Sequence, residues 1–112
     1  MNSVVLSEKI SEILLDKKAN DVDLIKIENL TILADYFVLC TGTSTTHIKT
    51  LADEVIEKLK EEGIECHHIE GYESSKWILL DYSSVIVHIF HEEERKYYNL
   101  ERLWSDGIIT RK

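Results

Sequence analysis

The chain has 112 residues, of which 44% are hydrophobic and 30% are charged, a balance typical of a folded domain and not of a disordered chain. Thirteen lysines and arginines stand against 21 aspartates and glutamates, so the formal net charge is −8. This charge disfavours binding in a DNA or RNA groove, because proteins that bind there usually present a basic face. We expect one domain over residues 1–112 and a basic partner, with no direct contact to DNA.

The sequence carries no pattern of secretion, membrane insertion or disulfide bonding. The first ten residues lack the apolar core of a signal peptide, and no apolar run approaches the roughly 18 residues of a membrane span. Cys40 and Cys66 both lie in apolar stretches, so we expect free thiols. The sequence therefore predicts a cytoplasmic protein, or the mature part of an organelle protein, with no membrane partner.

The first third of the chain predicts one helix and two strands. Apolar residues recur at helical spacing over residues 4–18, which predicts a helix. A short run rich in branched side chains predicts a strand at 22–27. The run at 36–41 is largely apolar, as is typical of a strand buried on both faces.

The clearest element is a helix over residues 45–62. Its apolar side chains recur three and four positions apart, at Ile48, Leu51, Ala52, Val55, Ile56 and Leu59. Thr43 or Ser44 can cap its start, and Gly63 stands where a glycine commonly ends a helix. We expect Leu51, Val55 and Leu59 to face the sheet. A strand at 64–69 would complete a strand–helix–strand unit, right-handed if its two strands are parallel neighbours.

A hairpin and a helix are predicted for the rest of the chain. Residues 76–82 and 85–90 are strand-like and flank only Ser83 and Ser84, which predicts a tight antiparallel hairpin. Three glutamates at the start of 92–104 suit the N-terminus of a last helix. Together these elements predict an α/β (α+β) fold, a mixed five-stranded sheet with flanking helices.

Metal-binding patterns are weak in this sequence. Cys66, His67 and His68 are adjacent, so their side chains alternate across a strand and cannot all bind one ion. No Cys-x-x-Cys pair accompanies them. We expect no metal and no cofactor.

A nucleotide-binding or nucleotidyltransferase-like enzyme is the alternative function. Thr43 and Ser44 lie between a strand and a helix, where free N–H groups can bind phosphate, although a P-loop's glycines and lysine are missing. Asp21 and Asp23 could share a strand face and bind magnesium, although no third carboxylate is evident nearby.

Interface-type residues concentrate in the segment 77–104, which is rich in Trp, Tyr and Arg. Trp77, Leu79 and Asp81 share one face of the predicted strand, and Tyr82 falls on the other. Since Asp81 would be costly in a closed core, we expect the Trp77 face to meet solvent or a partner.

Three stretches resemble a known family. They are ADYFVLCTGTSTTHIKTLAD at 34–53, EGYESSKWILLDYSSVIVHIF at 70–90 and EERKYYNLERLW at 93–104. In this order they resemble the ribosomal silencing factor family, also called the Iojap-like family, over about residues 5–106. The pieces W-x-x-x-D-Y, V-x-V-H-x-F and R-x-x-Y-x-L-E-x-L-W belong to the signature.

The resemblance implies a domain of nucleotidyltransferase-like shape that lacks catalytic carboxylates and is not an enzyme. It implies binding to the large ribosomal subunit through a basic ribosomal protein, ribosomal protein fourteen of that subunit, on the face that meets the small subunit. A protein docked there would block subunit joining and lower translation, chiefly when nutrients are scarce.

Candidate contact residues follow from the matched signature positions. The W-x-x-x-D-Y piece gives Trp77, Asp81 and Tyr82, and the V-H and R-x-x-Y pieces add His88, Arg95 and Tyr98. Independently of the resemblance, the edge strands of a small sheet could pair between two copies, so a homodimer stays open.

Overall fold

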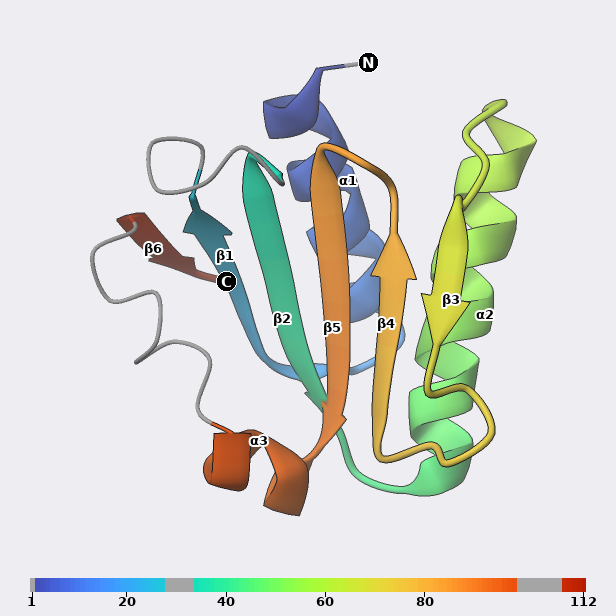
Figure 1. Ribbon diagram of the computed structural model, residues 1–112, viewed down its shortest axis with the longest axis vertical. Coiled ribbons are helices and arrows are strands. Elements are labelled where there is room, and N and C mark those ends of the chain that lie inside the picture. The colour runs from blue at the N-terminus through green and yellow to red at the C-terminus, as the bar shows by residue number, and fades with distance from the viewer. Residues whose placement is uncertain (1, 28–33, 99–107) are drawn as a thin grey trace.

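The computed structural model describes residues 2–27, 34–98 and 108–112 (Figure 1). The helices in these ranges are α1 (Ser3–Asp16), α2 (Thr45–Glu61) and α3 (Glu92–Tyr98). The strands are β1 (Asn20–Lys26), β2 (Tyr36–Gly42), β3 (His68–Glu70), β4 (Trp77–Asp81), β5 (Val85–His91) and β6 (Ile108–Arg111). The predicted α/β class and mixed sheet are confirmed.

The strands form one sheet in the order β3-β4-β5-β2-β1-β6. The central pair β2 and β5 is parallel, and every other neighbouring pair is antiparallel. Helices α1 and α2 lie side by side on one face of this sheet, whereas α3 follows β5 at its carboxyl end (Figure 1). We call the sheet face opposite α1 and α2 the second face.

The main core lies between the sheet and the two long helices. Leu51, Val55 and Leu59 are fully buried there, as their spacing predicted. Ser44 caps α2 by accepting a hydrogen bond from the His47 N–H at 3.0 Å. Gly63 follows the helix with φ of 79°, a left-handed conformation that glycine adopts without strain.

A smaller cluster of apolar residues lies on the second face. Its buried members are Ile25, Ile27, Ala34, Leu39 and Phe90, and the partly buried Phe37, Trp77 and Ile86 pack against them. The sheet is therefore apolar on both faces, although α1 and α2 cover only one of them.

The two strands of the expected strand–helix–strand unit are not neighbours in the sheet, so the condition for a right-handed crossover between parallel neighbours is not met. The parallel neighbour of β2 is β5, and β3 lies two strands further away at the sheet edge. The strand expected at 64–69 is observed only at His68–Glu70. Ile64 instead belongs to the end of α2, where its N–H donates to the Leu59 carbonyl at 2.9 Å.

The sheet has a sixth strand that the sequence did not predict. Strand β6 extends the sheet by antiparallel pairing with β1, where Ile109 lies opposite Ile25. The helix predicted over 92–104 is seen as α3 up to Tyr98, and the rest lies outside the described residues. Nowhere in the described ranges is a helix long and apolar enough to cross a membrane.

Candidate partner-binding site

Strand β4 presents the predicted interface residues on the second face. Its exposure alternates, with Ile78 and Leu80 buried against the helix side and Trp77, Leu79 and Asp81 half-buried. The face that the sequence assigned to the three half-buried residues is confirmed. This alternation follows from the strand period of two.

Trp77 is held on the second face by two aromatic neighbours. Its ring lies 4.9 Å from the ring of Phe90, measured between centroids, and its Nε1–H donates to His88 Nδ1 at 3.1 Å. The sequence predicted an exposed tryptophan, whereas the side chain is half-buried. Part of the Trp77 side chain therefore packs within the protein, and the rest is accessible for contact with a partner.

His88 lies beneath this tryptophan and is only 5% exposed. The Phe37 ring packs edge-on against the imidazole at 4.8 Å. Burial lowers the pKa of His88 to about 4, so the ring is neutral at neutral pH. Its low exposure means that His88 does not form part of the accessible surface.

Asp81 has a local role in the hairpin turn. Its Oδ1 accepts a hydrogen bond from the Ser83 N–H at 2.7 Å, and Ser83 has φ of 66°. An aspartate that accepts from the backbone two residues onward stabilises such turns. The carboxylate is half-buried, so it supports the turn while remaining partly accessible.

Tyr82 lies on the opposite side of the sheet from Trp77. It is 4% exposed and belongs to the core beneath α1 and α2. Burial raises the pKa of its hydroxyl above the usual range. Its position therefore separates it from the other two residues of the W-x-x-x-D-Y match.

Arg95 belongs to a buried network at the end of the sheet. Its guanidinium binds Asp23 Oδ2 at 2.8 Å and Thr41 Oγ1 at 3.2 Å, and it also reaches the Asp21 carbonyl. Asp23 is fully buried and also binds Arg111, at 3.1 Å. Arg95 thus ties α3 to β1 and β2.

The partner of Arg95 could not be found from local sequence, because Asp23 precedes it by 72 positions. Tyr98, the last candidate, closes α3, and its side chain lies outside the described residues. Of the six candidate contacts, the structure therefore brings together Trp77, Asp81 and His88 on the second face.

The residues of the alternative nucleotide site have local partners. The Thr43 N–H donates to His47 Nδ1 at 3.0 Å, and Ser44 caps α2. The Asp23 carboxylate faces two arginines, and the exposed Asp21 carboxylate lies 3.9 Å from Arg111. Searched over the described residues, His, Cys, Asp and Glu form no group of three or more that could hold a metal ion.

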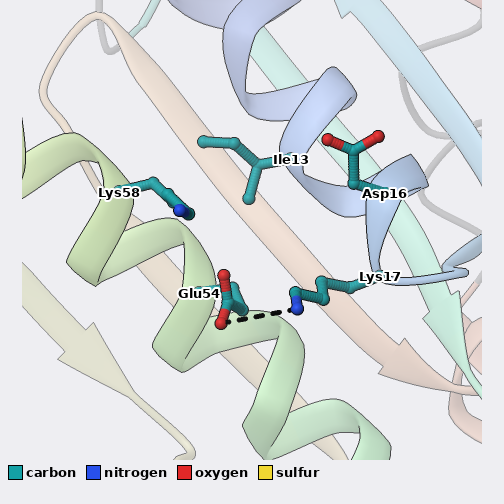
Figure 2. Close-up of a pocket in the computed structure, with 5 residues that line it drawn as sticks. All are labelled: Ile13, Asp16, Lys17, Glu54 and Lys58. Atoms are coloured by element: carbon teal, nitrogen blue, oxygen red, sulfur yellow. Dashed lines mark ion pairs between the residues drawn. The ribbon is translucent and has the colours of Figure 1, made fainter.

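A cleft of about 400 Å³ lies between α1 and α2, away from the second face (Figure 2). Ile13 and Asp16 of α1 and Lys17, which follows α1, line one side, and Glu54 and Lys58 of α2 line the other. Lys17 Nζ lies 3.8 Å from Glu54 Oε1, which spans the cleft. Two acidic and two basic side chains leave the cleft without a net charge that would select a ligand.

Comparison with known proteins identifies the family. The family model described as "Ribosomal silencing factor during starvation" matches residues 2–111. Ribosomal silencing factor RsfS of Halalkalibacterium halodurans is 43% identical over 92 residues, which cover 82% of this chain and 79% of that protein.

Two further comparisons extend this match to structure and to eukaryotes. A crystal structure of a Chromobacterium violaceum protein superimposes with a TM-score of 0.91 at 36% identity, covering 94% of this chain and 88% of that one. The mouse protein named "Mitochondrial assembly of ribosomal large subunit protein 1" is 30% identical over 83% of this chain and 42% of its own length. The family resemblance seen in the sequence motifs is thus confirmed, and the chain belongs to the ribosomal silencing factor family.

Proposed function

We propose that this protein docks onto the large ribosomal subunit through the second face of its sheet. The observation that carries the proposal is the half-buried row of Trp77, Leu79 and Asp81 on the sheet face away from α1 and α2, in a member of the ribosomal silencing factor family. A row that combines an aromatic anchor, an aliphatic side chain and an acid suits a protein surface that is apolar and basic. The name of the mouse relative supports the large subunit as the particle involved.

The docking partner in this proposal is a basic ribosomal protein, ribosomal protein fourteen of the large subunit. A protein with net charge −8 is repelled by ribosomal RNA and attracted by a basic protein patch. Such complementarity increases the association rate and disfavours misplaced binding to RNA.

The proposed mechanism is steric exclusion in the cytoplasm, without catalysis. The described part of the molecule extends 35 × 34 × 23 Å, large enough to occupy space that the small subunit must enter. A domain docked on the joining face of the large subunit would block subunit joining and repress translation when nutrients are scarce.

Co-sedimentation with separated ribosomal subunits tests the proposal. We expect the protein to pellet with large subunits and not with small ones. Trp77→Ala should weaken this binding by about 30- to 1,000-fold, since truncating an aromatic anchor commonly costs about 2–4 kcal/mol. Leu15→Ala is the matched control, because Leu15 is an exposed apolar residue of α1 (42% exposed) and should bind as the parent does.

A second variant separates loss of binding from loss of fold. Trp77 packs on Phe90, so Trp77→Ala also removes a packing contact. Leu79→Lys places a repulsive charge on the same face beside Trp77 without removing an aromatic ring. If both variants melt normally and still bind at the parental affinity, the second face is not the docking surface.

An ATP and GTP binding assay tests the alternative that the protein is a nucleotide-processing enzyme. We expect no micromolar affinity for ATP or GTP in the presence of magnesium. Micromolar binding that is lost in Ser44→Ala would favour the nucleotide-processing alternative.

A further inference from the structure

The hydrogen bond between Trp77 and His88 fixes the protonation form of the imidazole. An indole Nε1–H can only donate, so His88 Nδ1 must accept through its lone pair. Because burial keeps the ring neutral, its single proton then resides on Nε2. Only one of the two neutral tautomers of His88 can hold the indole.

Apart from the hydrogen bond that it accepts from Trp77, His88 contributes little to the fold that an apolar side chain would not. His88 Nε2 is buried and has no hydrogen-bond partner among the residues that the structure describes. A buried donor without an acceptor destabilises the folded state, whereas an apolar side chain of similar size would avoid this cost. The neighbouring rings of Phe37 and Phe90 offer an apolar environment that would suit such a side chain.

We propose that His88 is a positioning residue, which fixes the Trp77 indole in one orientation for docking and does not itself touch the partner. The accessible part of the indole is what a partner would meet, while His88 is 5% exposed and lies underneath. This inference rests on the proposed function, because it assigns a role within the same docking face.

The expected size of the effect follows from conformational populations. Without the acceptor at Nδ1, the indole can rotate away from the orientation in which Nε1–H points inward. If the docking orientation falls to about a tenth of the population, the apparent affinity falls about tenfold. Molecules in the docking orientation present the same contact surface as the parent, so the affinity should fall without a change in which subunit is bound.

Two substitutions separate the acceptor from the bulk of the side chain. His88→Leu removes the unpaired Nε2–H, which stabilises the fold, and also removes the acceptor of the Trp77 indole N–H, which destabilises it. The two effects oppose each other, so this variant should melt close to the parental temperature and bind large subunits about tenfold more weakly. His88→Asn places Oδ1 close to the former Nδ1 and should retain binding to within about threefold, even if its melting temperature falls. Parental affinity in a folded His88→Leu protein would overturn the proposal.

A double-substitution cycle tests whether His88 acts through the indole. Trp77→Phe keeps an aromatic ring but has no N–H to donate. In that background His88→Leu should cause no further loss of large-subunit binding. An equal tenfold loss in both backgrounds would show that His88 acts independently of Trp77 and would overturn the positioning role.

Nuclear magnetic resonance tests the hydrogen bond without ribosomes. Long-range ¹H–¹⁵N correlation of the imidazole should show the proton on Nε2, and the Trp77 indole N–H should exchange slowly and shift in His88→Leu. A proton on Nδ1 would overturn the proposal whatever the binding data. A parental protein with the Nε2 proton that fails to pellet with large subunits would instead refute the proposed function, on which the docking role depends.

Discussion

Single residues on the second face serve the fold and the surface together. Trp77 packs on Phe90 and is still partly accessible, and Asp81 supports a turn while keeping part of its carboxylate exposed. A substitution that removes the whole side chain therefore changes stability and binding at once. Substitutions that keep one role and remove the other are more informative.

Asp81→Asn separates the turn from the charge. Asparagine retains Oδ1 as an acceptor for the Ser83 N–H, so the free energy of unfolding should change by less than about 0.5 kcal/mol. The lost charge should weaken large-subunit binding about two- to fivefold, as expected for a partly exposed ion pair. Glu57→Gln, the same charge change on the exposed side of α2, is the control and should leave binding unaltered.

The buried His88 predicts a dependence of stability on pH. Its pKa is about 4 in the folded protein and 6.5 when unperturbed, so between these values the unfolded chain takes up a proton that the folded chain excludes. Stability should therefore fall as pH decreases through this window, with about 2 kcal/mol lost at pH 5 relative to pH 7.

The contribution of His88 is the difference in the pH dependence of stability between the parent and His88→Leu. Carboxylates titrate in both proteins, so their contribution cancels in this difference. Denaturant midpoints measured at pH 7 and pH 5 should diverge between them. Equal pH dependence in the two proteins would mean that His88 is protonated in the folded state well above pH 4.

At the scale of elements, the sequence predicted periodic segments well and long-range pairing poorly. Helix α2 matched its apolar stripe closely because the 3.6-residue period extends over four turns. Strand β6 was missed because four residues carry too little pattern, and it depends on β1 for pairing. Nothing local could indicate that β5, and not β3, is the parallel neighbour of β2.

In the candidate site, too, local periodicity was predictable from the sequence and contacts between distant segments were not. Alternation along β4 was enough to place Trp77 and Asp81 on one face and Tyr82 on the other. The hydrogen bond from Trp77 to His88 and the ion pair from Arg95 to Asp23 were beyond prediction, since each joins separate elements.

Leu59→Ala tests the buried face of α2. Leu59 is fully buried against the sheet, so its truncation should lower the free energy of unfolding by about 2–5 kcal/mol. Val55→Ala removes a smaller side chain from the same stripe and should cost less. An unchanged denaturation midpoint for Leu59→Ala would mean that the helix buries another face.

Arg95→Gln tests whether Arg95 supports the fold or contacts a partner. Its side chain is 11% exposed and pairs with the fully buried Asp23, so the variant should lose about 3 kcal/mol of stability. Thermal melting measures this loss. A variant that melts as the parent does but fails to bind large subunits would instead place Arg95 in the interface.

At the scale of the whole molecule, charge governs where the protein can bind. The net charge of −8 creates repulsion from RNA and attraction to basic protein at the same time. Salt screening weakens both interactions, so it lowers the affinity through the attraction and raises it through the repulsion.

We expect binding to large subunits to weaken as NaCl increases from about 0.05 to 0.5 M, where the screening length falls from more than 10 Å to less than 5 Å. The association rate should decrease more than the dissociation rate increases, as in electrostatically steered complexes. Stopped-flow fluorescence of a labelled protein measures both rates. Binding that strengthens with salt would mean that repulsion from RNA outweighs attraction to the basic partner.

The pairing of β1 with β6 has a consequence for the newborn chain. Residues 20–26 form one side of this ladder and 108–111 the other, so at ~5–20 residues per second β1 waits roughly 4–16 s for its partner during translation. For that interval the N–H and C=O groups on one edge of β1 stay open to other chains. Asp23 likewise waits for Arg95 and Arg111. Until those arginines are made, burying the Asp23 carboxylate costs free energy that no ion pair offsets.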